Sequence, residues 1–308
     1  MSLAAPVRAV DLPEVRGEYV EGARLADLTW LRVGGPADVL FMPADADDLA
    51  TFLKETPTDV PVTALGVGSN TLVRDGGVRG VVIRLGAPFA KVSVDGMRVT
   101  AGAAALDATI AKHAGRAGVA GLEFFRGVPG TIGGALKMNA GAYGGETKDV
   151  LVSCVGYDRT GARHAFSNAE MGFSYRKSST PDDIIFTEAL FEGRPDEPDA
   201  IAQRMDAIMQ SREASQPIRE KTSGSTFKNP DPATSGGRGA WQLVEAVGGR
   251  GRQLGDAQFS DLHCNFLINR GAATASDLEA LVESVRLDVE RQEGVALEWE
   301  VKRIGERV

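Results

Sequence analysis

The stretch Gly121–Glu146, GLEFFRGVPGTIGGALKMNAGAYGGE, contains eight glycines in twenty-six residues and decides which fold we expect. Pro129-Gly130 predicts a turn, and Thr131 stands where it can cap a short helix over 132–138. The two glycines inside that helix leave its first N–H groups uncovered, which suits an anion or a flat ring. The alternative, a glycine-rich crossover between packed elements, stays open at this point.

A second glycine turn, Leu65–Asn70 (LGVGSN), follows a short apolar run that predicts a strand at 62–65. Its consecutive backbone N–H groups, with the side chains of Ser69 and Asn70 as further donors, suit a phosphate group. Gly-x-Gly after a strand is also a common structural turn, and this one is not the GxGxxG that opens a helix in dinucleotide-binding folds. A nucleotide site is therefore expected only because Gly121–Glu146 supplies a second loop of the same kind.

Short strand-like runs with helical spacing between them predict an α+β fold for the opening part of the chain, and strands dominate the middle. A break rich in proline, glycine and acidic residues at 192–199 predicts a linker before the C-terminal part. Ser276 with Glu279 forms the capping-box pattern at the start of a C-terminal helix that closes at Gly294. The other expected elements are strands at 32–41, 79–85, 184–191 and 295–301, hairpins at 91–101 and 150–166, and helices around 49–53, over 106–118 and from 201 onward.

The composition limits the classes of partner. The chain has 308 residues, enough for roughly two or three domains with their own cores. Basic residues number 34 and acidic residues 42, so the net charge of −8 disfavours nucleic acid and anionic membrane and favours a small molecule. Cys154 and Cys264 form no metal or disulfide pattern, so we expect no metal site and a reducing, cytoplasmic location. The sequence contains no apolar run long enough to span a membrane.

Five motifs carry a resemblance that covers nearly the whole chain. In order, they are GVGSN (66–70), the 121–146 stretch, FSYR (173–176), SGSTFKNP (223–230) and LEWEV (297–301). This order resembles the UDP-N-acetylenolpyruvoylglucosamine reductase family, whose members are also called UDP-N-acetylmuramate dehydrogenases. The resemblance implies an FAD-binding domain of the vanillyl-alcohol-oxidase (PCMH) type at 1–194, in two α+β subdomains at about 20–86 and 87–194. It also implies a smaller C-terminal α+β substrate domain at 199–308, of the shorter class that lacks an inserted substrate lid.

The resemblance also implies which residues hold FAD. The GVGSN loop would bind the pyrophosphate, and the later loops would line the flavin. Relatives that bind flavin covalently use a His or Cys near these loops, whereas His113, His164 and His263 lie elsewhere, so FAD is expected to be exchangeable. The implied cofactor-binding residues are Gly66, Val67, Gly68, Ser69, Asn70, Gly130, Thr131, Ile132, Gly133, Asn139, Ala140, Gly141 and Ala142.

Three polar residues are implied as catalytic. Reduction of an enol ether of pyruvate requires stabilisation of an enolate and a proton donor. By resemblance, Arg176 and Glu300 would stabilise the enolate, and Ser225 would donate the proton with help from a neighbour such as Lys228. From the residues alone, Arg176 fits a surface ion pair and Ser225 fits a turn serine bonded to the backbone. No GxSxG motif surrounds Ser225, which argues against a serine-hydrolase nucleophile.

The implied substrate contacts are Tyr175, Lys228, Asn229 and His263. His263 fits a core histidine equally well. Trp299 stands where the family commonly has proline, Leu262 where a polar or basic residue is usual, and Lys137 where an aromatic residue often occurs. These departures put local substrate contacts in question and leave the expected reaction unchanged.

The activity implied by the resemblance is the NADPH-dependent, FAD-mediated reduction of UDP-N-acetylglucosamine enolpyruvate to UDP-N-acetylmuramate, in bacterial peptidoglycan precursor synthesis. NADPH would reduce FAD first, and hydride would then pass to the enolpyruvyl methylene carbon. We expect a cytoplasmic monomer. Two rival functions stay open: an FAD oxidase of the same fold, which needs neither Ser225 nor Glu300, and a non-catalytic sensor of nucleotide sugars that keeps the cleft.

Overall fold

The structure, a computed structural model, describes residues 6–308 and divides them into two compact units. Unit 1 comprises residues 6–21, 38–66 and 80–211, and unit 2 comprises residues 22–37, 67–79 and 212–308. The GVGSN loop therefore starts in unit 1 at Gly66 and continues in unit 2. The expected division by binding role, into 1–194 and 199–308, stays a prediction.

The N-terminal sheet of unit 1 contains β1 (Glu18–Glu21), β2 (Ala37–Met42), β5 (Val78–Ile83) and β3 (Val62–Ala64), in that order. Helix α1 (Ala46–Glu55) begins after Asp45, whose side chain accepts a hydrogen bond from the N–H three residues later. The ring centroid of its buried Phe52 lies 4.4 Å from that of Phe41 on β2. The helix expected around 49–53 is confirmed, whereas the strand expected at 32–41 starts only at β2, because a Gly-Gly-Pro run precedes it.

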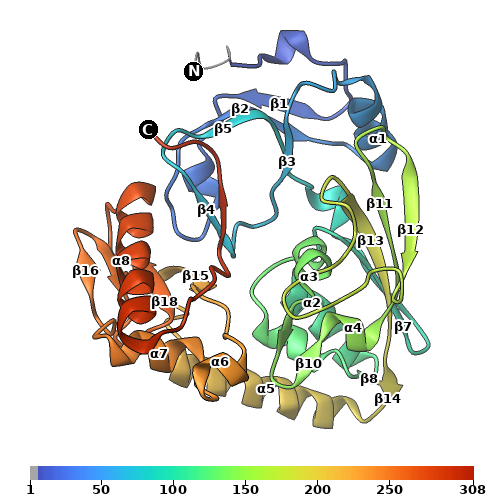
Figure 1. Cartoon of the computed structure of the whole chain (residues 1–308). Helices are drawn as coiled ribbons and strands as arrows, with labels where there is room; N and C mark the ends of the chain where they lie inside the picture. The colour runs from blue at the N-terminus through green and yellow to red at the C-terminus, as the bar shows by residue number, and fades with distance from the viewer. Residues whose placement is uncertain (1–5) are drawn as a thin grey trace. The chain divides into compact units, whose positions relative to one another are not determined.

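The second sheet of unit 1 contains β12 (Arg163–Ser167), β11 (Leu151–Tyr157), β13 (Ile185–Glu192), β7 (Arg98–Gly102) and β6 (Val92–Asp95), in that order. Both expected hairpins are confirmed, and in the first of them Asp95 pairs with Arg98 across the turn. Helices α2 (Asp107–Arg116) and α3 (Ile132–Met138) pack against β7, and α3 also packs against β13 (Figure 1). The helix expected over 132–138 is confirmed as α3, but the side chain of Thr131 does not cap it.

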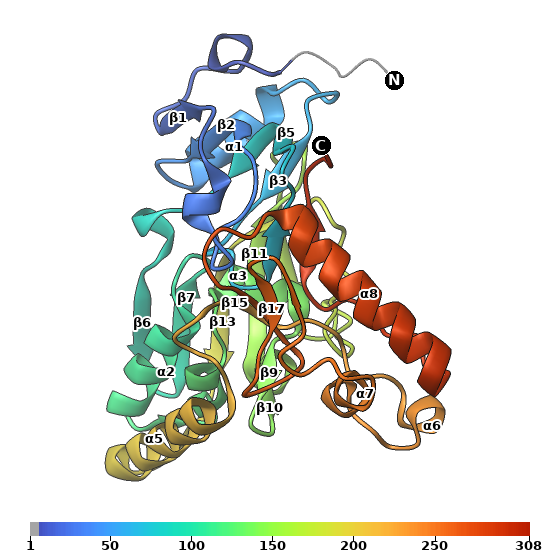
Figure 2. The same ribbon diagram turned by 90° about the vertical axis from the view of Figure 1, so that its left-hand side faces the viewer.

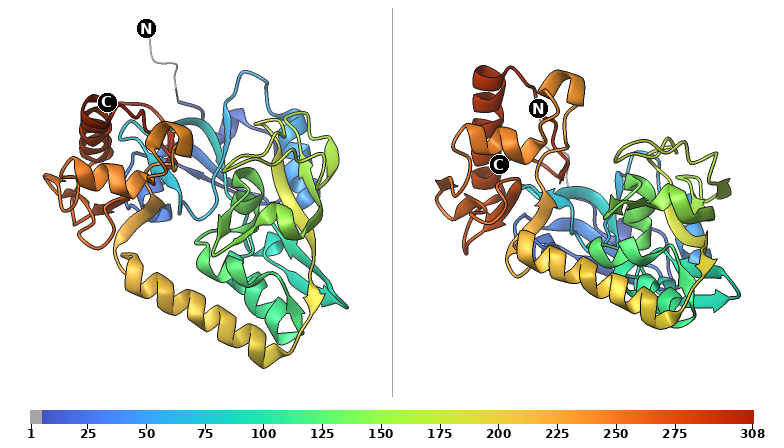
Figure 3. Two further views of the ribbon diagram at one scale, coloured as in Figure 1. Left: turned by 60° about the horizontal axis from the view of Figure 1, so that its bottom comes forward. Right: turned by 90° about the horizontal axis from the view of Figure 1, so that it is seen from below.

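The linker expected at 192–199 is wrong in part. Strand β14 (Arg194–Pro195) pairs with β8 (Val119–Ala120), and helix α5 (Pro198–Ser215) begins at Pro198. Proline suits the first turn of a helix because that N–H has no intrahelical partner, so Pro198 starts a helix here. Figure 3 shows α5 as one long helix that follows β14. The other elements of unit 1 are η1 (Ala9–Asp11), η3 (Ala87–Phe89), η4 (Glu123–Gly127), β9 (Gly141–Ala142), β10 (Gly145–Glu146) and α4 (Thr147–Val150).

The sheet of unit 2 contains β15 (Lys221–Ser225), β18 (Phe266–Asn269), β17 (Ala257–Phe259) and β16 (Gln253–Leu254), in that order. Helix α8 (Ala275–Glu293), seen along its length in Figure 2, packs against β16, β17 and β18, because its apolar residues recur at helical spacing and form one buried stripe. Gly294 ends α8 with φ +70, which confirms the expected C-terminal signal. Unit 2 also contains η2 (Leu25–Leu28), α6 (Pro232–Ser235) and α7 (Ala240–Ala246).

The expected cap of α8 is wrong. Thr274 and Asp277 form the capping box, in place of Ser276 and Glu279. Thr274 has the extended backbone of an N-cap, with φ −83 and ψ 163, and its hydroxyl accepts a hydrogen bond from the N–H of Asp277 (3.0 Å). The hydroxyl of Ser276 donates instead to Asp75 (2.7 Å), a residue far away in sequence, so Ser276 does not cap the helix.

The strand expected at 295–301 is also wrong. Of these seven described residues, only Trp299 forms a β-bridge, with Phe227. The regular strand follows as β19 (Lys302–Ile304) and pairs in parallel with β4 (Thr71–Val73). The apolar alternation of 295–301 reflects burial of Val295, Leu297 and Val301 in the core of unit 2, with no neighbouring strand in register.

Candidate active site

The GVGSN loop (66–70) follows β3, as expected, and leads into β4. A Cβ atom at Gly66 would lie 3.1 Å from Oγ1 of Thr131, so the start of this loop lies beside the start of α3. Gly68 has φ +64, and a Cβ atom there would lie 2.7 Å from Cα of Thr29. Backbone conformation and packing therefore require glycine at position 68, whatever the loop binds.

The start of α3 is less open than its sequence suggests. The N–H of Ile132 donates to the carbonyl of Ala105 (3.0 Å), and the N–H of Gly133 donates to that of Ala103 (2.8 Å). Of the first three helical N–H groups, only that of Gly134 has no hydrogen-bond partner among the described residues, and a Cβ atom at Gly134 would meet nothing within 4 Å. The expected row of bare N–H groups is therefore corrected to a single free donor next to open space.

Asn139, the residue after α3, is fully buried and has a left-handed backbone with φ +41. Its Nδ2 donates to the carbonyl of Ser174 (3.2 Å) and to Oε2 of Glu146 (3.1 Å), and its Oδ1 accepts from the N–H of Lys148 (3.0 Å). Burial would raise the pKa of Glu146, but hydrogen bonds from Lys148 and Asn139 and the charge of Arg176 hold this pKa below its usual range. Asn139 thereby fixes the loop after α3 to the segment that carries Arg176.

Arg176 lies at the tip of a turn between Ser174 and Lys177, which form a β-bridge. The last strand before Arg176 is β12, which ends nine residues earlier at Ser167. The backbone of Arg176 has φ +55, and its guanidinium donates to the carbonyl of Gly141 (3.0 Å) and lies 4.9 Å from the ring centroid of Tyr175. Left-handed backbone at a non-glycine residue is costly and concentrates at functional sites, so this turn stands out from an ordinary surface loop.

Ser225 ends β15, where the pairing with β18 becomes irregular between Thr222 and Ser225. Gly224 has φ +79, and a Cβ atom there would meet nothing within 4 Å. Irregularities of this kind re-aim side chains and are frequent beside active sites. Among the described residues the hydroxyl of Ser225 makes no hydrogen bond, so the interpretation as a turn serine bonded to backbone finds no support.

Within unit 2, the backbone N–H and carbonyl of Glu300 form hydrogen bonds with the residue after Ser225 and with the side chain of Asn70 in the GVGSN loop. The N–H of Glu300 donates to the carbonyl of Thr226 (2.8 Å), and the carbonyl of Glu300 accepts from Nδ2 of Asn70 (3.2 Å). The N–H of Lys302 donates to the carbonyl of Asn70 (3.0 Å). The structure thus brings Ser225, Glu300 and Asn70 together, although the sequence separation of Asn70 and Glu300 is 230 residues.

Three of the four expected substrate contacts, Lys228, Asn229 and His263, have partners inside unit 2. The ammonium of Lys228 pairs with Oε2 of Glu298 (3.1 Å), so its expected help to the Ser225 hydroxyl is not supported. Oδ1 of Asn229 accepts a hydrogen bond from the N–H of Ala240 (3.0 Å), the first residue of α7. Asn229 therefore holds the start of that helix through its oxygen.

His263 lies near two aromatic rings of unit 2, at 4.7 Å from Phe266 and 6.5 Å from Trp241 between ring centroids. Burial lowers the pKa of His263, so the ring is neutral at pH 7. Its Nδ1 accepts from the N–H of Asn265 (3.3 Å), which leaves the proton on Nε2 as a donor. The ring is half-buried, so the core and substrate-contact interpretations both stay open.

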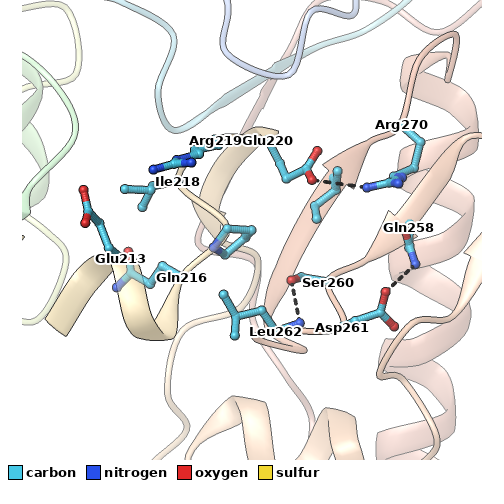
Figure 4. Close-up of a pocket in the computed structure, with 12 residues that line it drawn as sticks. Glu213, Gln216, Ile218, Arg219, Glu220, Gln258, Ser260, Asp261, Leu262 and Arg270 are labelled. Atoms are coloured by element: carbon cyan, nitrogen blue, oxygen red, sulfur yellow. Dashed lines mark hydrogen bonds and ion pairs between the residues drawn. The ribbon is translucent and has the colours of Figure 1, made fainter. Parts of the chain in front are cut away.

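A pocket of about 420 Å³ in unit 2 contains none of the residues expected from the sequence (Figure 4). Gln258 and Ile268, which line it, pair in register on β17 and β18. The hydroxyl of Ser260, also in its lining, accepts hydrogen bonds from the N–H groups of Leu262 (3.1 Å) and His263 (3.2 Å). No local motif marks this pocket, because its lining comes from two distant segments of the chain.

Asp107, the first residue of α2, carries no motif signal but lies beside the glycine loops. Its N–H donates to the carbonyl of Gly130 (3.1 Å), and its neighbour Leu106 forms a β-bridge with Thr131. Its side chain is buried, with 1% exposure of the residue, and neither carboxyl oxygen has a hydrogen-bond partner among the described residues. Burial therefore raises the pKa of Asp107 well above its usual value.

Asp107→Asn is expected to make the folding stability less dependent on pH. Because the folded-state pKa is raised, native wild-type protein keeps a proton that the unfolded chain loses above about pH 4. Wild-type stability then falls as pH rises from there towards the folded-state pKa, by up to about 1.4 kcal/mol per pH unit, and asparagine does not titrate. We therefore expect the difference in melting temperature, variant minus wild type, to increase as the pH is raised from about 5 to about 8.

Thermal unfolding of the FAD-bound protein at several pH values measures this difference. Asp95→Asn, which changes an exposed aspartate in the β6–β7 turn, is the matched control and should run parallel to the wild type. A difference between Asp107→Asn and the wild type that stays constant with pH would contradict the assignment of a protonated, buried Asp107.

Comparisons with known proteins agree along the whole chain. Residues 37–166 match the model of an FAD binding domain, and residues 216–304 match that of the UDP-N-acetylenolpyruvoylglucosamine reductase C-terminal domain. Relatives named UDP-N-acetylenolpyruvoylglucosamine reductase include that of Parvibaculum lavamentivorans, 59% identical over 100% of this chain and 98% of its own length. The one from Phenylobacterium zucineum is 62% identical over 96% of this chain and 97% of its own length.

A solved structure is similar over nearly the full length. The crystal structure of UDP-N-acetylenolpyruvylglucosamine reductase from Thermus caldophilus is 36% identical, with a TM-score of 0.81, and the match covers 95% of this chain and 100% of that one. These matches confirm the expected fold, an α+β FAD-binding domain with a smaller C-terminal α+β domain.

Proposed function

The chain belongs to the UDP-N-acetylenolpyruvoylglucosamine reductase family and is an FAD-containing oxidoreductase, and from this premise we propose its reaction. It reduces UDP-N-acetylglucosamine enolpyruvate to UDP-N-acetylmuramate in peptidoglycan precursor synthesis, with NADPH as the source of hydride. The observation that carries the proposal is the 59% identity, over 100% of the chain, with a reductase of this name.

The two glycine loops fit a bound dinucleotide. Within unit 1, Gly66 lies against Thr131 at the start of α3, and the N–H of Gly134 in the first turn of α3 is a free donor beside open space. We assign FAD binding to residues 66–70, 130–133 and 139–142, without a covalent bond. FAD, when bound, supplies the hydride chemistry between NADPH and the enolpyruvyl methylene carbon.

Arg176, Glu300 and Ser225 are the proposed catalytic residues. The guanidinium of Arg176 forms an ion pair with the substrate carboxylate. Together with Glu300, it stabilises the enolate that forms when hydride is transferred to the substrate. Ser225 then donates a proton to the carbon next to that carboxylate. Three observations support these roles: the left-handed backbone of Arg176, the hydroxyl of Ser225 without a hydrogen bond, and the backbone bonds that join Glu300 to Thr226 and Asn70.

The proposed substrate contacts are Tyr175, Lys228, Asn229 and His263. Tyr175 has 46% of its surface exposed, and the Nε2 proton of His263 is available to an acceptor. We propose a cytoplasmic monomer whose ligands are the enolpyruvyl sugar nucleotide and NADPH. Across residues 6–308, no helix has both the length and the apolar character that crossing a membrane requires.

An anaerobic spectrum of the purified protein tests the proposed function. The protein should be yellow, should bleach when NADPH is added, and should regain its colour only when UDP-N-acetylglucosamine enolpyruvate follows. Reoxidation by oxygen with no response to the sugar nucleotide would identify the oxidase rival. Binding of the sugar nucleotide without any recovery of colour would identify the sensor rival.

A further inference from the structure

We propose that Trp299, held by Glu283 of α8, positions Glu300 for the second half of the reaction, so that α8 contributes positioning residues to catalysis. This inference rests on the proposed function of Glu300. It concerns residues of unit 2 alone. Glu283 and Trp299 act through Glu300 and touch neither the substrate nor the cofactor.

The backbone around Glu300 needs such a support because regular structure is absent there. In the described segment 294–301 the β-bridge between Trp299 and Phe227 is the only strand pairing. Hydrogen bonds reach this segment on both sides of the bridge, from Lys228 N–H to Glu298 carbonyl (2.9 Å) and from Glu300 N–H to Thr226 carbonyl (2.8 Å). A single bridge fixes a segment less firmly than a continuous ladder, so a contact through the Trp299 side chain adds to the hydrogen bonds that the backbone of Glu300 makes with Thr226 and Asn70.

The side chain of Trp299 supplies that constraint. Its Nε1–H donates to Oε1 of Glu283 (2.6 Å), its ring meets that of Phe227 edge-on at 6.2 Å, and the guanidinium of Arg303 lies 4.3 Å from its ring centroid. Neighbouring residues of an extended segment point to opposite sides. With the Trp299 ring fixed against α8, the side chain of Glu300 is directed away from α8.

Glu283 can fix the position of the Trp299 ring because its side chain is charged and is held in place by two arginines. Oε2 of Glu283 accepts from Nε of Arg286 (2.7 Å), and Oε1 lies 3.4 Å from Nη1 of Arg303. Burial would raise the pKa of Glu283, but the hydrogen bonds from Arg286 and Trp299 hold it below its usual range. The bond from Trp299 is therefore made to a carboxylate, which accepts more strongly than a neutral oxygen.

A second carboxylate on the same face of α8, that of Glu279, binds arginines that lie on or next to β4 and β19. Glu279, one turn before Glu283, is buried and accepts hydrogen bonds from Arg74, which follows β4 (3.1 Å to Nη2). Arg303 on β19 lies 3.6 Å from Glu279 and so bridges both carboxylates. Because β4 and β19 pair with each other, α8, the end of the GVGSN segment and the C-terminal strand form one connected support.

Two substitutions test the proposal, and each removes one partner of the hydrogen bond between Trp299 and Glu283. Glu283→Ala removes the acceptor, and Trp299→Phe removes the donor while keeping a ring against Phe227. Each is expected to slow reoxidation of reduced FAD by the enolpyruvyl sugar nucleotide about 10-fold, because misplacement of a catalytic group mainly affects the step it serves. Reduction of FAD by NADPH should stay within about two-fold of wild type in both, since Glu300 has no role in that step. Glu283→Gln, which keeps an acceptor oxygen, should recover most of the loss.

The double variant Glu283→Ala/Trp299→Phe should reoxidise no more slowly than the slower single variant, because both changes break the same hydrogen bond. Glu290→Ala is the control, since Glu290 accepts from the same Arg286 (3.3 Å) without contacting Trp299, and it should behave as wild type in both half-reactions. Unchanged reoxidation in the single variants, equal losses in both half-reactions, or additive losses in the double variant would overturn the inference. Failure of the wild-type protein itself to reoxidise with the sugar nucleotide would instead remove the proposed function.

Discussion

Ser225→Ala is expected to slow the reoxidation of reduced FAD by UDP-N-acetylglucosamine enolpyruvate by about 10²- to 10⁴-fold, the range that a positioned general acid contributes. Reduction of FAD by NADPH should stay within about two-fold of the wild-type rate, because no proton from Ser225 enters that half-reaction. Ser225→Ala should therefore slow the half-reaction with the sugar nucleotide and leave the half-reaction with NADPH near its wild-type rate.

The surroundings of Ser225 explain why no neighbour is expected to take its place. The adjacent Thr226 is fully buried, and neighbouring residues on a strand point to opposite faces. The ammonium of Lys228 is paired with Glu298. The hydroxyl of Ser225 has no hydrogen-bond partner among residues 6–308, so it is available to a ligand and its loss leaves the reaction without a donor at that point.

Anaerobic stopped-flow measurement of flavin absorbance gives both rates for each variant. Ser223→Ala is the matched control, because it removes a buried hydroxyl without a hydrogen-bond partner two residues away on the same strand. This control should leave both half-reactions near the wild-type rates. Comparable losses in the two half-reactions of Ser225→Ala would show that Ser225 supports the fold or FAD binding and is not the acid.

Local signals predicted the elements that depend on neighbours in sequence. The hairpin turn at Asp95 and the glycine that ends α8 need only a few consecutive residues, and the structure confirms both. The cap expected at Ser276 is wrong, because the hydroxyl of Ser276 binds Asp75, 201 residues away in sequence, and Thr274 caps the helix instead. Local patterns therefore locate an element more reliably than they locate its first residue.

The candidate active site is harder to predict than the helices and strands, because it depends on contacts between residues that are far apart in sequence. The open start of α3 was predicted from its glycines, yet carbonyls of Ala103 and Ala105 occupy two of its N–H groups. The hydrogen bond between Asn70 and Glu300 joins residues that are 230 positions apart in sequence, and no spacing rule reveals it. Asp107 is an aspartate at the start of a helix, an ordinary position, and only its burial makes it unusual. Motif order identified the candidate residues, whereas their partners required the structure.

Glu300→Gln is expected to slow reoxidation of reduced FAD by the sugar nucleotide by about 10²- to 10³-fold, the effect of losing one preorganised electrostatic group at a developing charge. The loss should appear in kcat more than in KM, because the enolate exists only after hydride transfer begins. Reduction of FAD by NADPH should remain near the wild-type rate.

The substitution isolates the carboxylate because the structural contacts of Glu300 that join it to Thr226 and Asn70 use its backbone N–H and carbonyl, which glutamine keeps. Glu298→Gln makes the same chemical change two residues earlier, at a side chain with 76% exposure, and should retain most of the reoxidation rate. Equal losses in the two variants would mean that the charge of the segment matters in general. A loss confined to Glu300→Gln would assign the required charge to Glu300, the neighbour of Trp299, whose ring is bound to α8. The variants at Glu283 and Trp299 then measure whether the packing of the C-terminal helix contributes to that role.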